Sequence, residues 1–99
     1  MATYPELFGG LVTLGSQATV LSSEITPMCE LEIRTLPTAG RVYFGNANVT
    51  PGGDNAFGFI DAGEAKTWGP YTRGGGIRPA QVFVAGIQGA VILWSGFPG

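Results

Sequence analysis

Apolar and polar residues alternate most regularly along residues 28–36. A period of two is typical of a β-strand that packs one face on a core and exposes the other face to water. The positions predicted to face inward are Cys29, Leu31, Ile33 and Thr35. The positions predicted to face outward are Glu30, Glu32 and Arg34. Charges on the outer face also discourage edge-to-edge aggregation.

The rest of the chain contains further short strand patterns separated by turn residues. Residues 11–21 are rich in β-branched side chains around Gly15, which favours two short strands over a helix. Residues 41–49 follow the turn at 37–40, and we expect them to form a hairpin with residues 28–36. Residues 81–85 and 90–95 are expected to form a second hairpin across the glycine turn between them. This last pair is almost continuously apolar, so we expect one face to be covered by a second sheet and the other by a neighbouring subunit. The alternative is a central sandwich strand that loops partly shield.

These patterns predict an all-β fold, a small antiparallel β-sandwich of about seven or eight short strands. The sandwich is expected over residues 11–99, preceded by an N-terminal arm at residues 1–10. The arm carries three large apolar side chains, Tyr4, Leu7 and Phe8. It either frays as an ordinary terminus or docks on a neighbouring molecule.

Composition changes this picture by adding an expectation of assembly. Only 12% of the 99 residues are charged, against about 25% in ordinary domains, and a chain this short has a modest core. Burial against copies of itself or a partner would cover the excess apolar surface. The formal charge of −2 and the scattered lysine and arginine residues argue against nucleic acid as a ligand. With no basic-then-apolar leader and no apolar run of about 20 residues, we expect a chain that stays in the cytoplasm and contacts no membrane.

Candidate chemistry is sparse. The chain has no histidine and one cysteine, Cys29, so we expect no metal site, no cofactor and a buried structural thiol. The polar loop at residues 46–55 matches a glycosylation sequon and weakly suggests calcium or phosphate binding, but a turn-rich connection explains it more simply. A hydrolase built on carboxylates alone would have to use Asp54, Asp61 and Glu64. We expect the protein not to be an enzyme.

The later part of the chain, from about residue 41 onward, resembles the small β-sandwich proteins of tailed-bacteriophage virions. The resemblance lies in a strand with a Tyr-x-Gly-Asn step, a polar loop, an Ala-Gly-Glu turn and a closing Val-x-Val-x-Gly strand. The matching positions are Val42, Tyr43, Gly45, Asn46, Ile60, Ala62, Gly63, Glu64, Val82, Val84 and Gly86. They span roughly the C-terminal two-thirds of the chain.

This resemblance implies a capsid decoration (cement) protein that assembles in the host cytoplasm and binds the outside of the virion shell. Its partners would be the major capsid protein and itself, as a homotrimer. The alternative is a binding module of a head fibre or tail tip that holds a host-surface glycan on aromatic residues such as Trp68 and Tyr71. From apolarity and placement, the predicted contact residues are Tyr4, Leu7, Phe8, Trp68, Tyr71, Arg73, Arg78, Trp94 and Phe97.

Overall fold

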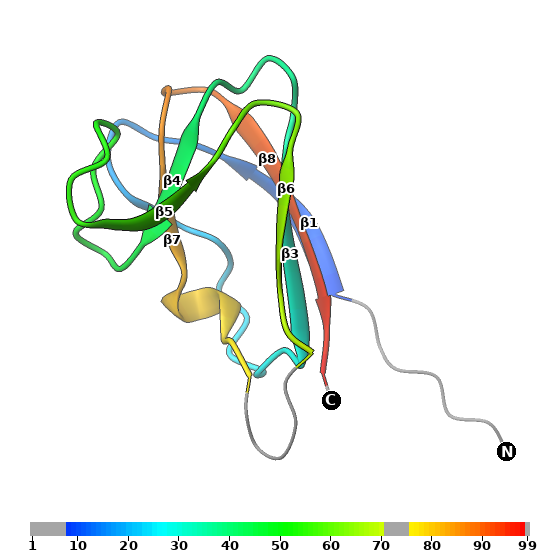
Figure 1. Cartoon of the computed structure of the whole chain (residues 1–99). Coiled ribbons are helices and arrows are strands. Elements are labelled where there is room, and N and C mark those ends of the chain that lie inside the picture. Colours follow the sequence, from blue (N-terminus) through cyan, green and yellow to red (C-terminus); the bar gives the residue numbers. More distant parts are fainter. Residues whose placement is uncertain (1–7, 71–75, 99) are drawn as a thin grey trace, which may run out of the picture.

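The computed structural model describes residues 8–70 and 76–98, and it is all-β, as the sequence predicts (Figure 1). Within these residues there are eight strands and one short 3-10 helix, η1. The strands are β1 (Phe8–Thr13), β2 (Thr19–Val20), β3 (Glu30–Thr35), β4 (Val42–Gly45), β5 (Ala56–Ile60), β6 (Ala65–Trp68), β7 (Phe83–Ala85) and β8 (Val91–Phe97), and η1 is Pro79–Gln81. No helix in the described part of the chain is long and apolar enough to cross a membrane.

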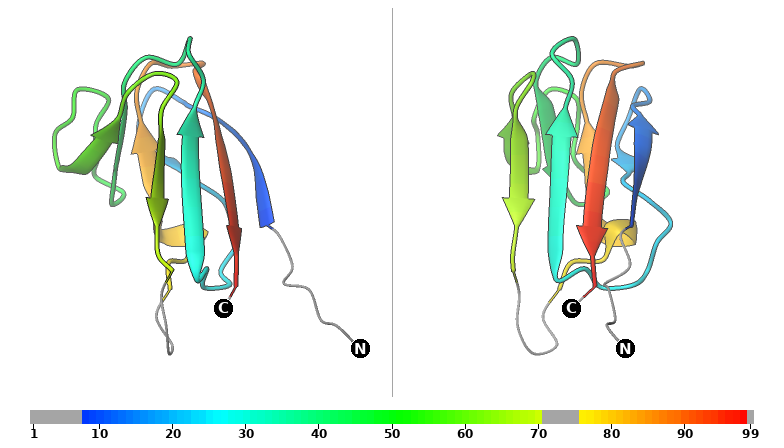
Figure 2. Two further views of the ribbon diagram at one scale, coloured as in Figure 1. Left: turned by 45° about the vertical axis from the view of Figure 1, so that its right-hand side comes forward. Right: turned by 90° about the vertical axis from the view of Figure 1, so that its right-hand side faces the viewer.

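The strands form two four-stranded sheets that pack face to face as a β-sandwich (Figure 2). One sheet, called sheet A, has the order β1-β8-β3-β6, and the other, sheet B, has the order β2-β7-β4-β5. Every pairing within them is antiparallel. This is the topology of a jelly roll, and here every connection except that from β4 to β5 passes from one sheet to the other.

The topology is easiest to follow as one long antiparallel ribbon. The first four strands pair with the last four in reverse order: β1 with β8, β2 with β7, β3 with β6, and β4 with β5. Rolling the ribbon then brings β3 against β8 and β4 against β7. Backbone hydrogen bonds continue the ribbon around its corners, from Leu14 N to Ala90 O, Leu21 N to Val82 O and Met28 N to Ile77 O, each 2.8 Å long.

The core lies between the sheets, where every strand but the short β2 and the edge strand β6 contributes a fully buried side chain. The alternation predicted for residues 28–36 is confirmed, because Leu31, Ile33 and Thr35 are buried and Arg34 is exposed. Cys29, predicted to be buried, is only half-buried at the entry to β3. Strand β8 alternates in the same way, with Ile92, Trp94 and Gly96 buried and the residues between them half-buried.

The two hairpins predicted from the sequence are wrong. Residues 28–36 and 41–49 supply β3 and β4, and residues 81–85 and 90–95 supply β7 and β8, yet the members of each pair lie in different sheets. Each connection crosses over the core instead of turning back within a sheet. Turn residues show that the chain reverses, but they do not show whether it does so in the plane of a sheet or across the core.

The boundary between arm and sandwich also falls at a different residue. Phe8 to Gly10, which the sequence places in the arm, form the first half of β1 and pair with Gly96 to Trp94 of β8. The rest of the predicted arm, residues 1–7, lies outside the described residues.

Thr35 is the one buried polar side chain in the described core, and it ties the turn between β5 and β6 to β3. Its Oγ1 lies 2.7 Å from the carbonyl oxygen of Asp61 and 3.0 Å from that of Glu64. Its own backbone N–H donates to the Glu64 carbonyl at 2.9 Å. Both carbonyls also accept a backbone N–H, since the Glu64 N–H donates to the Asp61 carbonyl at 3.0 Å. The buried hydroxyl, with its single proton, adds a hydrogen bond to one of these two carbonyls and so finds a partner inside the core.

We predict that Thr35→Val lowers the free energy of unfolding by about 1–3 kcal/mol, because the shape is kept while a buried hydrogen bond is lost. Thr67→Val is the matched control on an exposed strand position and should change stability by no more than about 0.5 kcal/mol. Urea unfolding followed by circular dichroism measures both. Equal stability of the two variants would contradict the role given to Thr35.

Candidate functional site

Six large apolar side chains remain exposed on the described part of the chain, between 38% and 70% of their full area. They are Leu11, Val20, Ile25, Phe57, Phe59 and Ile87. Two of them are aromatic residues on the single strand β5. We call Phe57, Phe59 and the neighbouring side chains of Tyr43 and Arg41 the β5 surface.

The local sequence explains why β5 turns its aromatic residues outward. Ile60 is buried, so the alternate residue Phe59 faces solvent on the outside of sheet B. Gly58 faces inward, and a Cβ there would lie 2.6 Å from the Phe44 ring, which fills the space that a side chain would need. A bulge between Phe44 and Gly45 leaves Phe57 as the extra residue of β5, at 70% exposure.

The outer part of the β5 surface is an ordered aromatic and cationic cluster. The Phe59 ring packs edge-on against Tyr43, with centroids 6.4 Å apart. The Arg41 guanidinium lies 4.0 Å from the centroid of Phe59, and its Nε donates to Asp61 Oδ1 at 2.8 Å. The Asp61 carboxylate, and then Tyr43, raise the pKa of Arg41 above its ordinary value, so the group stays charged. Because the ion pair is exposed, it contributes little to stability, but it orients Arg41 over the ring.

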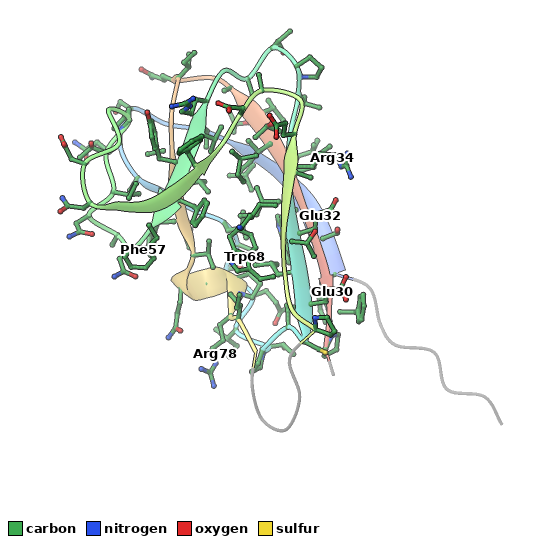
Figure 3. All side chains as sticks on the ribbon, viewed as in Figure 1. Glu30, Glu32, Arg34, Phe57, Trp68 and Arg78 are labelled. Atoms are coloured by element: carbon green, nitrogen blue, oxygen red, sulfur yellow. The ribbon has the colours of Figure 1, made fainter. Side chains whose placement is uncertain are left out.

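On the other side of β5, a small pocket opens between the edges of the two sheets. Its volume is about 220 Å³, and Trp68, Phe44 and Phe57 form much of its wall. The Trp68 and Phe44 rings meet edge-on at 5.0 Å, and Figure 3 shows Trp68 directed from β6 into the space between the sheets. The pocket is lined by Leu31, Phe44, Gly45, Asn46, Phe57, Trp68, Ile77, Gln81 and Val82. No charged residue is among these, so the pocket suits an uncharged group.

Apart from the Arg41–Asp61 pair, the following charged residues lie away from the β5 surface and the pocket. Glu30, Glu32 and Arg34 line the outer side of sheet A, facing away from sheet B (Figure 3), and Arg34 donates to Glu32 at 3.1 Å. Asp54 and Asp61 flank β5 at opposite ends of the strand, so these carboxylates do not form a pair. Among the residues described, no group of three or more histidine, cysteine, aspartate or glutamate side chains could hold a metal ion.

Five of the nine predicted contact residues are described by the structure, and they do not form one surface. Phe8 is half-buried and packs against the core from β1, whereas Phe97 is half-buried at the outer end of β8 opposite Glu30. Arg78 is exposed directly before η1. The other four, Tyr4, Leu7, Tyr71 and Arg73, lie outside the described residues.

The two predicted tryptophan contacts differ from each other. Trp94 is a core residue with 7% of its area exposed, because it occupies an inward position of β8. Its side chain is therefore packed between the sheets and is not an exposed contact residue. Trp68 packs against the core on one side and lines the pocket on the other, so it alone joins the candidate site.

Sequence reasoning missed Phe57 and Phe59 as surface residues. Part of the signal was present in the run Phe-Gly-Phe-Ile, because burying Ile60 places the Phe59 ring on the opposite face. Neither the bulge nor the fit of Phe44 over Gly58 could be read from the local pattern.

Comparisons of the chain with protein-family models, with curated proteins and with solved structures found no match.

We predict that Phe57→Ser changes the free energy of unfolding by no more than about 0.5 kcal/mol, because the side chain is mostly in water already. Phe44→Ala, opposite the residue that follows Phe57 in β5, should cost on the order of 3 kcal/mol, since this ring packs on the core and on Trp68. Chemical unfolding measures the free energy of unfolding of both variants and so distinguishes a surface side chain from a core side chain. A large loss of stability in Phe57→Ser would show that this ring is structural and not part of a binding surface.

Proposed function

We propose that the protein is a bacteriophage capsid decoration (cement) protein that binds the outer surface of the shell formed by the major capsid protein. The observation that carries the proposal is the β5 surface, on which a stable small sandwich displays Phe57 and Phe59 to solvent. Aromatic residues and arginine are enriched in the centres of protein interfaces, and exposed apolar patches mark binding sites. The resemblance of residues 42–86 to virion proteins supports the choice of partner.

The fold is compatible with this role, by analogy only. Jelly rolls are frequent in viral capsid proteins. Because the same fold serves many functions, the partner is proposed from the sequence resemblance and not from the fold.

The proposed mechanism is adhesion repeated over many copies. Phe57 and Phe59 would insert into depressions on the shell as apolar anchors, while Arg41 and Asp61 would form a polar rim beside them. A stable contact of this kind buries on the order of 1,000 Å² or more. Summed over a shell, such contacts oppose expansion of the capsid. The charged outer side of β3, with Glu32 and Arg34, would then face the surrounding water.

The pocket beside Trp68 favours a second candidate function, a glycan-binding module of a head fibre or tail tip. Trp68, Asn46 and Gln81 are among its lining residues, a set that offers an indole for stacking against a sugar ring and amide groups for its hydroxyl groups. Lectin domains also use jelly rolls. The pocket is small, so it would accept one ring and not a long chain.

We predict that purified particles of the phage encoding the chain contain it in a number of copies comparable to that of the major capsid protein. Quantitative mass spectrometry of the particles measures this ratio. A ratio lower by an order of magnitude or more, together with binding on a glycan array that Trp68→Ala abolishes, would replace the first proposal with the second. Absence of the chain from the particles would contradict both.

The β5 surface is tested by adding purified protein to particles that lack it and measuring the bound fraction by co-sedimentation. Phe57→Ser and Phe59→Ser should each weaken binding about 30-fold, since an interface anchor contributes about 2 kcal/mol. Ile25→Ser is the matched control, because Ile25 is as exposed as Phe57 but lies on the connection between β2 and β3. Equal binding by all three variants would contradict this assignment of the contact surface.

A further inference from the structure

The edges of the two sheets differ in how well they are protected. Strands β1 and β6 are the edges of sheet A, and β2 and β5 are the edges of sheet B. An edge strand presents backbone N–H and C=O groups that another strand can pair with, and proteins block such edges by shortness, charge or bulges. Strand β2 has only two residues, β5 carries the bulge, and β6 has four residues with the exposed Lys66 among them.

Strand β1 has none of these protections. It is six residues long, Phe-Gly-Gly-Leu-Val-Thr, without charge or proline. Its register with β8 is unbroken from Phe8 opposite Gly96 to Thr13 opposite Val91. Gly9 and Gly10 are both exposed, and because glycine has no side chain, this exposure belongs to the backbone itself.

The hydrogen-bond pattern identifies which groups of β1 point away from the sheet. Leu14 N donates to Ala90 O and Leu14 O accepts from Gly89 N, both at 2.8 Å, so both backbone groups of Leu14 point toward the segment that leads into β8. Hydrogen-bonded and non-bonded pairs alternate along an antiparallel ladder. Val12, Gly10 and Phe8 therefore bond to β8, and the backbone groups of Gly9, Leu11 and Thr13 point outward.

We propose that β1 pairs with β1 of a second copy of this chain, antiparallel, about a two-fold axis at Leu11. Gly9, Leu11 and Thr13 are spaced evenly about Leu11, so the outward groups of one copy match those of the other. Leu11 then pairs with Leu11 of the second copy, and Gly9 pairs with Thr13. The two A sheets become one continuous sheet that crosses both molecules.

The side chains favour a second copy over an unrelated strand. Leu11 is 69% exposed on the outer face of sheet A and lies beside Leu93 of β8 in the register. Two-fold pairing brings the two Leu11 side chains together and makes one apolar row of Leu93, Leu11 and their two equivalents. The small residue Gly9 opposite Thr13 adds no steric conflict, and no like charges meet across the axis.

This pairing does not depend on the proposed function. Strand β1 lies in sheet A and the β5 surface in sheet B, so both can be occupied at once. A paired molecule would present two β5 surfaces, which raises the apparent affinity for any repetitive surface. The assembly is two-fold, in contrast to the trimer that the resemblance implies.

Sedimentation equilibrium of the full chain from micromolar to millimolar concentration tests the pairing. We expect a mass approaching twice the 10.3 kDa of one chain. Leu11→Lys and Thr13→Pro should each weaken association at least tenfold. The first adds like charges at the axis, and the second removes an outward N–H that β8 does not use. Ile25→Lys, at matched exposure, should leave the mass unchanged.

A covalent test locates the axis. The two Leu11 Cα atoms would lie about 5.5 Å apart as a hydrogen-bonded pair, which is within the range of a disulfide. In a Cys29→Ser background, Leu11→Cys should cross-link to a dimer under mild oxidation far faster than Ile25→Cys. A monomer at millimolar concentration, a mass three times that of the chain, or equal cross-linking of the two variants would overturn the pairing, whether or not the protein binds capsids.

Discussion

The pairing of β8 with both β1 and β3 is the interaction on which the rest of the structure depends. Strands β1 and β8 are the two ends of the ribbon, and the contact of β8 with β3 closes the roll. Its alternation places Ile92, Trp94 and Gly96 between the sheets. Gly96 has to be small, because a Cβ there would lie 2.8 Å from the backbone oxygen of Glu30. Without the pairing of β8 with β3, the ribbon would be an open ladder with its apolar face in water.

Rolling a short ribbon buries one face of each strand. The other face is left on the outside of the sandwich, and its residues are either compatible with water or need a partner to cover them. On sheet A, the outer side of β3 carries Glu30, Glu32 and Arg34, whereas the outer side of β1 and β8 carries Leu11 and Leu93. On sheet B, the outer side is aromatic around Phe59. The charged strip is already compatible with water. The two apolar regions are the surfaces that partners would cover, and they lie on different sheets.

Period-two alternation in the sequence was enough to predict the fold class and the inward face of β3. It could not predict pairing, because a ribbon that rolls up places neighbouring strands such as β7 and β8 in opposite sheets. Nor did apolarity identify the surface. Trp94 occupies an inward position of β8, and Phe59 faces outward because Ile60 is buried. Phe57 is exposed at the bulge and lines the pocket. These outcomes depend on contacts between residues distant in the sequence, which local patterns do not contain.

A sandwich that holds its strands together through one closed ribbon and displays apolar side chains on its outside is suited to adhesion, and we propose the capsid shell as the surface to which it adheres. Under this proposal a phage genome encodes the chain, and electron cryomicroscopy of that phage's virion tests the claim most directly. The account predicts density for the domain on the outside of the shell, with Phe57 and Phe59 of β5 at the contact. A shell without such density, or a bound domain whose β5 faces solvent, would contradict it.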